Sequence, residues 1–200
     1  MAEKIKKTRP ELLRQRRQLA MFQRFLPTLV LKKQQIQSEI LKVRTERDRL
    51  DRQMADKIRL SDGWATLFSE SLPGPVTRLV KVKNIQRGIR NVAGIKLPIV
   101  AGVEYEISDF SRLSTPPWVD AGLEFLKELL ELREKVKVLH EQEELLHQEL
   151  RKVTQRVNLF EKVKIPQAKD NIRLIRVSLA EEQTAAVGRS KIAKGKSAGS

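Results

Sequence analysis

The chain has 200 residues and a formal net charge of +15, with 32% charged and only 4% aromatic residues. So few aromatic side chains are poor material for a broad globular core, whereas a pair of long helices needs only one buried stripe on each helix. The sequence has no cysteine, which excludes disulfides and thiolate metal sites. The positive excess favours an anionic partner: nucleic acid, a membrane surface or an acidic protein.

The first predicted element is a coiled-coil helix within residues 1–60. Thr8 precedes Glu11 by three residues, as in a capping box, and Pro10 falls in the first turn, where its missing N–H costs little. Pro27 removes one backbone hydrogen bond and predicts a kink or a local break. Two seven-residue series, in which ten of fourteen positions are apolar, predict a continuous seam: Leu12, Leu19, Leu26, Lys33, Ile40, Arg47 and Met54, and Gln15, Phe22, Leu29, Ile36, Val43, Leu50 and Lys57.

A central insert follows at residues 61–117, where turn-forming residues interrupt the heptads. Pro73-Gly74-Pro75 and Pro116-Pro117 are the clearest of these stops. We expect a short helix here and a short β-hairpin, with strands at Val76–Ile85 and Ile95–Ile107 separated by Gly88 to Gly94.

A second coiled-coil helix is predicted over residues 118–182, with a flexible basic tail at 183–200. Its seam has a polar residue, Glu143, and an eleven-residue step from Val157 to Ala168, which is typical of a stutter that relaxes left-handed supercoiling. The remaining seam positions are apolar: Leu132, Val136, Leu139, Leu146, Leu150, Val153, Phe160, Ile165, Ile172, Ile175 and Leu179. The predicted fold is therefore all-α dominated, a long antiparallel two-helix coiled coil with a small insert that contains a hairpin.

Residues that could carry chemistry are few. His140 and His147 lie on one helix face but lack enough further ligands for a metal ion. Two solvent-exposed histidines of a coiled coil are therefore a simpler interpretation than a metal site. Gly195-Lys196-Ser197 lacks the other features of a phosphate-binding loop. We expect no catalytic, metal or cofactor site, no bound nucleotide and no enzymatic activity.

The opening of the first helix is strongly basic. Residues 1–60 contain 17 Lys and Arg against 7 Asp and Glu. The sequence leaves two interpretations open, a docking surface for an anionic partner or a solvated face. The candidate contact residues are Arg14, Arg16, Arg17 and Arg24.

The extreme N-terminus and the apolar content bear on location. MAEKIKKTRPEL lacks the apolar run of a signal peptide, and the longest uncharged apolar stretch, 97–103, is too short to span a bilayer. We therefore expect a cytoplasmic protein that reaches a membrane only through partner subunits.

Several stretches resemble the D subunit of the V-type and archaeal A-type rotary ATPases, in the same order along both helices and the insert. The most specific one is RVNLFEKVKIP at 156–166, followed by DNIRLIRVSLAEE at 170–182. ELLRQRRQLA at 11–20, Leu31-Lys32 and NVAGIKLP at 91–98 also agree. The positions assigned on this resemblance and on the seam are Arg156, Val157, Asn158, Glu161, Lys162, Pro166, Leu19 and Ile172.

The resemblance implies a central rotor shaft that performs no chemistry itself. Such a shaft stands inside a ring of catalytic A and non-catalytic B subunits, binds the small F subunit, and couples through a funnel-like C or d subunit to a membrane ring that moves H⁺ or Na⁺. Arg14, Arg16, Arg17 and Arg24 would then be contacts to the catalytic ring. The alternative is a basic coiled coil that binds nucleic acid or scaffolds another complex, although aromatics that could stack on bases are scarce.

Overall fold

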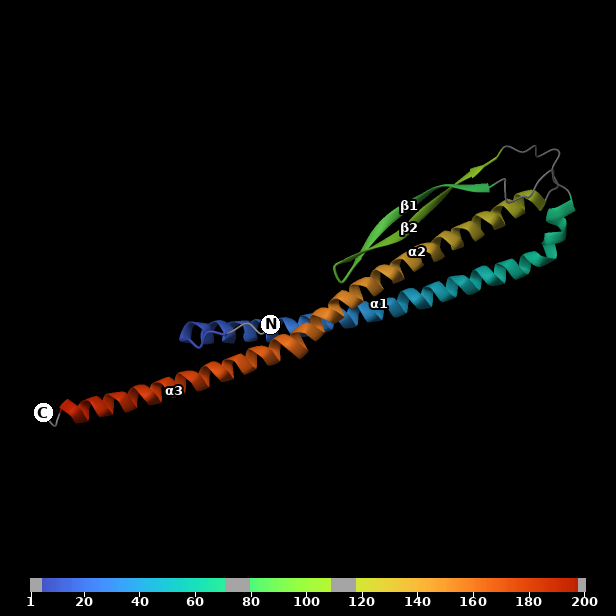
Figure 1. The fold of residues 1–200 in the computed structure, drawn as a ribbon. Helices are drawn as coiled ribbons and strands as arrows, with labels where there is room; N and C mark the ends of the chain where they lie inside the picture. The colour runs from blue at the N-terminus through green and yellow to red at the C-terminus, as the bar shows by residue number, and fades with distance from the viewer. Residues whose placement is uncertain (1–4, 71–79, 109–117, 198–200) are drawn as a thin grey trace. The chain divides into compact units, whose positions relative to one another are not determined.

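The computed structural model describes residues 5–70, 80–108 and 118–197, without the side chains of residues 61–70, 118 and 195–197. Its elements are α1 (Arg9–Glu70), β1 (Val80–Val92), β2 (Ile95–Ile107), α2 (Trp118–Asn158), the π-helix η2 (Leu159–Lys164) and α3 (Ile165–Ser197) (Figure 1). Long helices with one antiparallel hairpin confirm the predicted fold class. The chain forms two compact units, one made of residues up to Lys33 and from Lys152 onward, the other of Gln34–Arg151.

The helix α1 begins where the sequence predicts. The backbone N–H of Leu12 donates to the Thr8 carbonyl at 3.0 Å, the first bond of the helix. The helix then runs through Pro27 without interruption. The local break that this proline could have caused therefore does not form, and α1 continues ten residues past position 60, to Glu70. Half-buried Leu26 and Leu29 beside the proline hold the helix to its partner and offset the lost hydrogen bond.

The predicted seam is confirmed on both helices. All fourteen heptad positions on α1 are buried or half-buried, including the polar ones, and the same holds for the predicted positions of the second helix. A narrow stripe of this kind is what a two-helix coiled coil buries.

In the unit formed by Gln34–Arg151, cross-helix contacts show that α1 and α2 are antiparallel. Arg47 Nη1 lies 2.6 Å from Glu143, whereas Lys57, further along α1, pairs with Glu128, further back along α2. Ile36 and Leu146 are completely buried in this part of the seam.

The hairpin turns at Ala93-Gly94, two residues with positive φ of 52° and 79°, a conformation that suits a tight hairpin. The first strand was expected at residues 76–85; residues 76–79 lie outside the described residues, and β1 continues to Val92. The expected break at Gly88 is thus wrong. Gly88 pairs with Ile99 within the ladder, and a Cβ there would lie 3.0 Å from Cγ1 of Ile99. This glycine allows close packing and does not end the strand.

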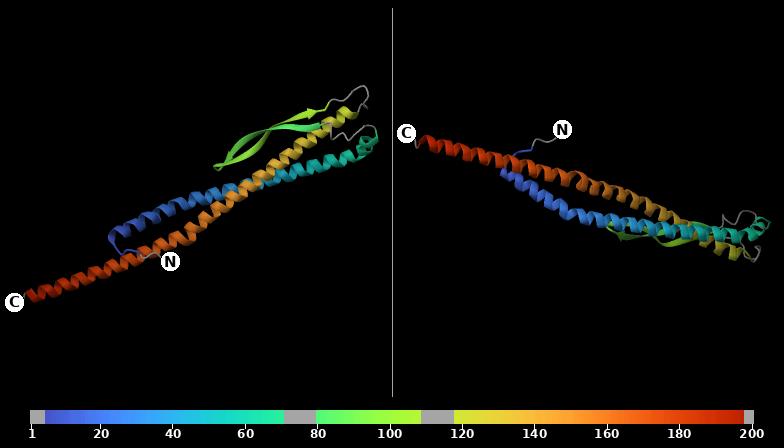
Figure 2. Two further views of the ribbon diagram at one scale, coloured as in Figure 1. Left: turned by 45° about the horizontal axis from the view of Figure 1, so that its top comes forward. Right: turned by 90° about the horizontal axis from the view of Figure 1, so that it is seen from below.

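The hairpin lies beside α2 in Figure 1 and behind α1 in the right view of Figure 2, so it runs along the helices of the same unit. At its open end Val80 packs with Val119 and Leu123, and the Tyr105 hydroxyl donates to the Lys127 carbonyl at 3.0 Å. Nearer the turn, ion pairs connect it to both helices: Arg87 to Glu141 on α2 at 3.0 Å, and Arg90 to Glu39 on α1.

In the unit formed by residues 5–33 and 152–197, α1 packs against η2 and α3. The rings of Phe22 and Phe160 lie 5.2 Å apart, and the seam positions Ile172 and Ile175 are buried while Leu19 is half-buried. Beyond them α3 continues to Ser197, so the stretch that was expected to be a flexible tail is helical for most of its length.

The irregularity predicted between Val157 and Ala168 is a π-helical turn. The N–H of Ile165 donates to the Phe160 carbonyl, five residues back, where an α-helix would use the residue four back. The seam positions Phe160 and Ile165 are five positions apart, one more than the three or four of a regular seam, and the wider turn accommodates this extra residue. Pro166 follows immediately, and since it has no N–H, it could not have continued the regular α-helical ladder.

Candidate partner-binding site

The N-terminal turns of α1 present an exposed cationic surface. From residue 12 to residue 33 the chain has no Asp or Glu. Arg14, Arg16, Arg17 and Arg24 are all exposed, the Arg14 side chain by 70%. Arg14 approaches Glu11 at 3.6 Å, a distance too long for a hydrogen bond. Because so few carboxylates of the chain lie near these arginines to neutralise their charge, this surface attracts acidic groups of other molecules.

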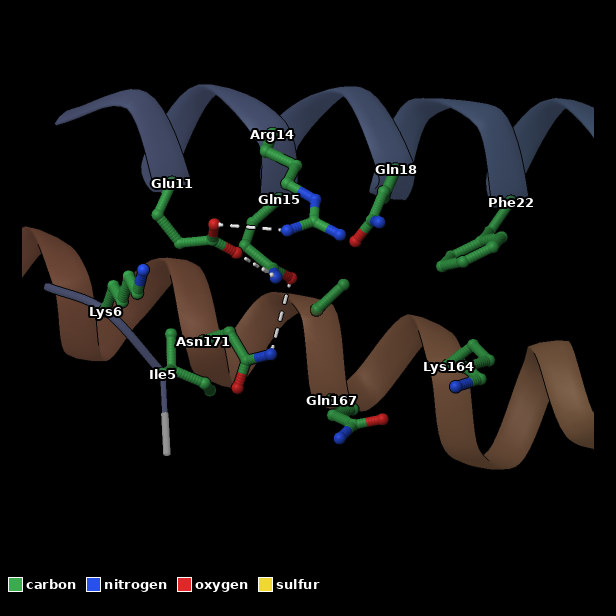
Figure 3. A pocket seen from close by; sticks show the side chains of 11 residues that line it. Ile5, Lys6, Glu11, Arg14, Gln15, Gln18, Phe22, Lys164, Gln167 and Asn171 are labelled. Carbon is green, nitrogen blue, oxygen red and sulfur yellow. Dashed lines mark hydrogen bonds and ion pairs between the residues drawn. The ribbon is translucent and has the colours of Figure 1, made fainter. Parts of the chain in front are cut away.

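A pocket of about 380 Å³ lies in the groove between α1 and α3 in the same unit (Figure 3). Arg14 and Gln18 reach into it from α1 toward α3. Its other polar lining residues include Lys6, Lys164, Gln167 and Asn171.

One hydrogen-bonded chain crosses this groove. Asn171 Nδ2 donates to Gln15 Oε1 at 3.3 Å, and Gln15 Nε2 donates to Glu11 Oε1 at 2.8 Å. The seam is therefore polar at this level, where buried Ala168 is also too small to fill the space. The heptad pattern predicts Gln15 in the seam but does not reveal the pocket. The signal that could have indicated it is a polar residue, Gln15, next to a small residue, Ala168, in the seam.

The family-motif residues lie on and around η2. Val157 is buried in the seam, while Arg156, Asn158, Glu161, Lys162 and Pro166 are exposed. The exposed residues do not converge on one cavity of the described structure, so they form a helix surface and not a compact site.

The C-terminal part of α3 is exposed on every side. Every residue from Ala180 to Lys194 is exposed, including Val187 by 56% and Ile192 by 64%. A stretch of this length is only marginally helical in water on its own. Contacts from another molecule would stabilise it.

The seam of the other unit contains a buried ionic cluster. Burial alone would raise the pKa of Glu143, but the hydrogen bond from Arg44 and the charges of Arg47, Arg44 and His147 outweigh it, so the pKa is lowered. The pKa of Arg47 is raised, first by its hydrogen bond to Asp48 and, against the effect of burial, by Glu143, Asp48 and Asp51. Glu143, the polar residue of the predicted seam, thus stays ionised next to Arg47, a polar seam position of α1.

The described residues contain no group of three or more side chains that could hold a metal ion. His147 lies 3.6 Å from Glu143, and His140 is exposed. Among the helices as described, none has an apolar run long enough to cross a bilayer. What the arrangement offers chemically is a set of exposed cations and amides that can bind an acidic surface.

Comparison with known proteins identifies the family. The family model for the D subunit of ATP synthase matches residues 11–195. A protein of Borreliella burgdorferi, named as the D subunit of a V-type ATP synthase, is 43% identical over 191 residues, which cover 96% of this chain and 94% of the relative. Proteins with the same name from Chlamydia pneumoniae and Chlamydia trachomatis are 33% and 32% identical, each over 98% of this chain and over 94% and 97% of the relative. The chain belongs to the ATP synthase D-subunit family.

Proposed function

We propose that this protein is the central rotor shaft of a V-type or A-type rotary ATPase. It would couple ATP hydrolysis or synthesis in the catalytic ring to H⁺ or Na⁺ transport, without catalysing a reaction or binding a nucleotide itself. The family match over residues 11–195 carries the proposal. It implies a complex with other subunits of the ATPase.

The helix pairing in each unit suits transmission of torque. Two helices joined by a continuous buried seam resist twisting better than one, and the ionic cluster at Glu143 opposes sliding of α1 along α2. A shaft must also release its contacts at every step. Exposed, solvent-screened Lys and Arg contacts are weak enough to do so, unlike large buried apolar ones.

The exposed surfaces of the unit of residues 5–33 and 152–197 support a position inside a ring. Arg14, Arg16, Arg17 and Arg24 would contact acidic residues of the A and B subunits, and the exposed helix at residues 180–194 would be stabilised by the surrounding wall. The small F subunit and the funnel-like C or d subunit are the further expected partners. The protein would lie in the cytoplasm, peripheral to the membrane through those partners.

Nucleic-acid binding or scaffolding of another complex is the alternative consistent with the basic charge. The family match gives it no support. Binding to unrelated duplex DNA that disappears near physiological salt would be only the background of any basic helix. Tight, salt-resistant binding would favour the alternative.

The proposal is tested by purifying a tagged chain from its own cells and identifying the subunits and ATPase activity that accompany it. We expect the catalytic ring and ATP hydrolysis to co-purify. Reversal of charge at Arg14, Arg16 and Arg17 to Glu should impair ATP-driven ion transport, whereas Lys at the same positions should preserve it. Absence of ring subunits, or normal pumping by the reversed variant, would contradict the rotor assignment or its contact residues, respectively.

A further inference from the structure

The pocket between α1 and α3 exists because the seam is left unfilled there. Ala168 is buried but small, and at the neighbouring level Gln15 and Asn171 pair with each other across the groove. Longer apolar side chains at these positions would have closed the interface. The gap of about 380 Å³ is instead lined mainly by polar side chains.

The charge of this pocket is positive. Lys6, Arg14 and Lys164 line it with one carboxylate, Glu11, so the formal balance is +2. The two oxygens of Glu11 are already engaged, one by Gln15 at 2.8 Å and the other facing Arg14 at 3.6 Å. The guanidinium of Arg14 thus keeps donors available for a second carboxylate.

Uncommitted amides add directional donors to this charge. Gln18 and Gln167 line the pocket and make no hydrogen bond to another described side chain. Lys164 is the last residue of η2 and is exposed. Two cations from the helices, one from the N-terminal segment and two amides therefore surround a space open to solvent, a donor set that suits an oxyanion.

The geometry points to a socket for an acidic side chain, Asp or Glu, of the subunits that surround the shaft. The carboxylate would bind Arg14 with Gln18 as a flanking donor, and Lys164 would add positive charge from the opposite wall of the pocket. This inference rests on the proposed function and adds to it a specific cavity and a specific chemistry of the partner. Charge complementarity decides the occupant, because a neutral or basic side chain would leave these cations uncompensated.

Lys164→Glu tests the socket in the reconstituted complex, with Lys169→Glu as the matched control. Lys169 is an exposed cation on α3 that does not line the pocket. We expect Lys164→Glu to raise the dissociation constant between shaft and ring about tenfold, and the control to change it less than about twofold. Lys164→Gln should have an intermediate effect, and circular dichroism should show that every variant remains helical.

A cross-link identifies the occupant. Because the chain has no native cysteine, Gln167→Cys carries a single photoreactive label at the pocket, and Lys169→Cys carries it outside. We expect the label at 167 to capture a ring-subunit peptide that contains Asp or Glu, and reversal of that acid to Lys to restore binding of Lys164→Glu.

The outcomes separate the socket from the proposed function. A wild-type chain that binds no ring would overturn both. Two results would overturn the socket alone, provided that the wild-type chain binds the ring. One is an equal effect of Lys164→Glu and Lys169→Glu on the dissociation constant. The other is a captured peptide that contains no acidic residue.

Discussion

The ionic cluster in the seam of the Gln34–Arg151 unit makes a quantitative prediction. Glu143 accepts hydrogen bonds from Arg44 at 2.9 Å and from Arg47 at 2.6 Å, and its side chain is only 11% exposed. Glu143→Gln removes the charge while keeping the shape. Arg47 then remains 80% buried, with only Asp48 and Asp51 to compensate it.

The expected cost is about 2 kcal/mol in the free energy of unfolding. A hydrogen bond to a charged group contributes roughly 1.5–3 kcal/mol, and rupture of a fully buried pair costs about 3–5 kcal/mol. Half of the Arg44 side chain is exposed, which places the value at the lower end. A double-mutant cycle with Arg47→Gln should give a coupling energy of about 1.5 kcal/mol.

The measurement is urea denaturation followed by circular dichroism, repeated between neutral and acidic pH. Because the pKa of Glu143 is lowered in the folded state, its contribution is present above its ordinary pKa of 4.5 and is lost as the pH falls through the folded value. Wild type should therefore lose more stability on acidification than Glu143→Gln. The exposed pair Arg87–Glu141, with side chains 50% and 43% exposed, is the matched control and should couple by less than about 0.5 kcal/mol. Equal coupling in the two pairs would refute the reasoning.

Three further predictions concern the hairpin and use the same denaturation assay. The pKa of Tyr105 is raised by burial and by Glu131, so the stability that its neutral hydroxyl contributes is present below pH 10 and is lost above it. Tyr105→Phe should lower the free energy of unfolding by about 1 kcal/mol at neutral pH and should reduce the loss of stability at alkaline pH. Gly88→Val should cost about 1–3 kcal/mol by crowding Ile99, whereas Gly102→Ala, whose new Cβ would be 3.5 Å from the nearest atom, should be nearly neutral; equal effects would contradict the packing role of Gly88. Ala93→Asn should stabilise the turn by about 0.5–1 kcal/mol because Asn tolerates the φ of 52°, and a loss of stability would argue against this turn.

The seam was predictable because one physical requirement, burial of a narrow stripe, repeats along both helices. Even its polar members followed the pattern: Arg47 and Glu143 both occupy core positions and neutralise each other there. Their pairing could not be read from either helix alone, since it depends on the alignment of the two.

The differences between the expected and the observed elements have local physical causes. Gly88 suggested the end of a strand, but its missing side chain serves close packing against Ile99. The glycines and cations after residue 182 suggested a flexible tail, but a helix continuing from a well-packed segment needs no new nucleation. The pocket could not be predicted, because its lining comes from three separate segments whose side chains meet only in the folded unit.

The π-turn connects the seam to the candidate socket. Phe160 and Ile165 are both half-buried although five residues separate them, and the bond between their backbones closes one wide turn over that gap. In a regular α-helix the ring of Pro166 would clash with the carbonyl four residues back, at Lys162. The π-turn therefore serves two purposes: it widens the helix at the five-residue step in the seam, and it removes the clash that Pro166 would cause in a regular α-helix. Lys164 ends this turn and lines the pocket, so the same irregularity that preserves the seam contributes a cation to the candidate socket.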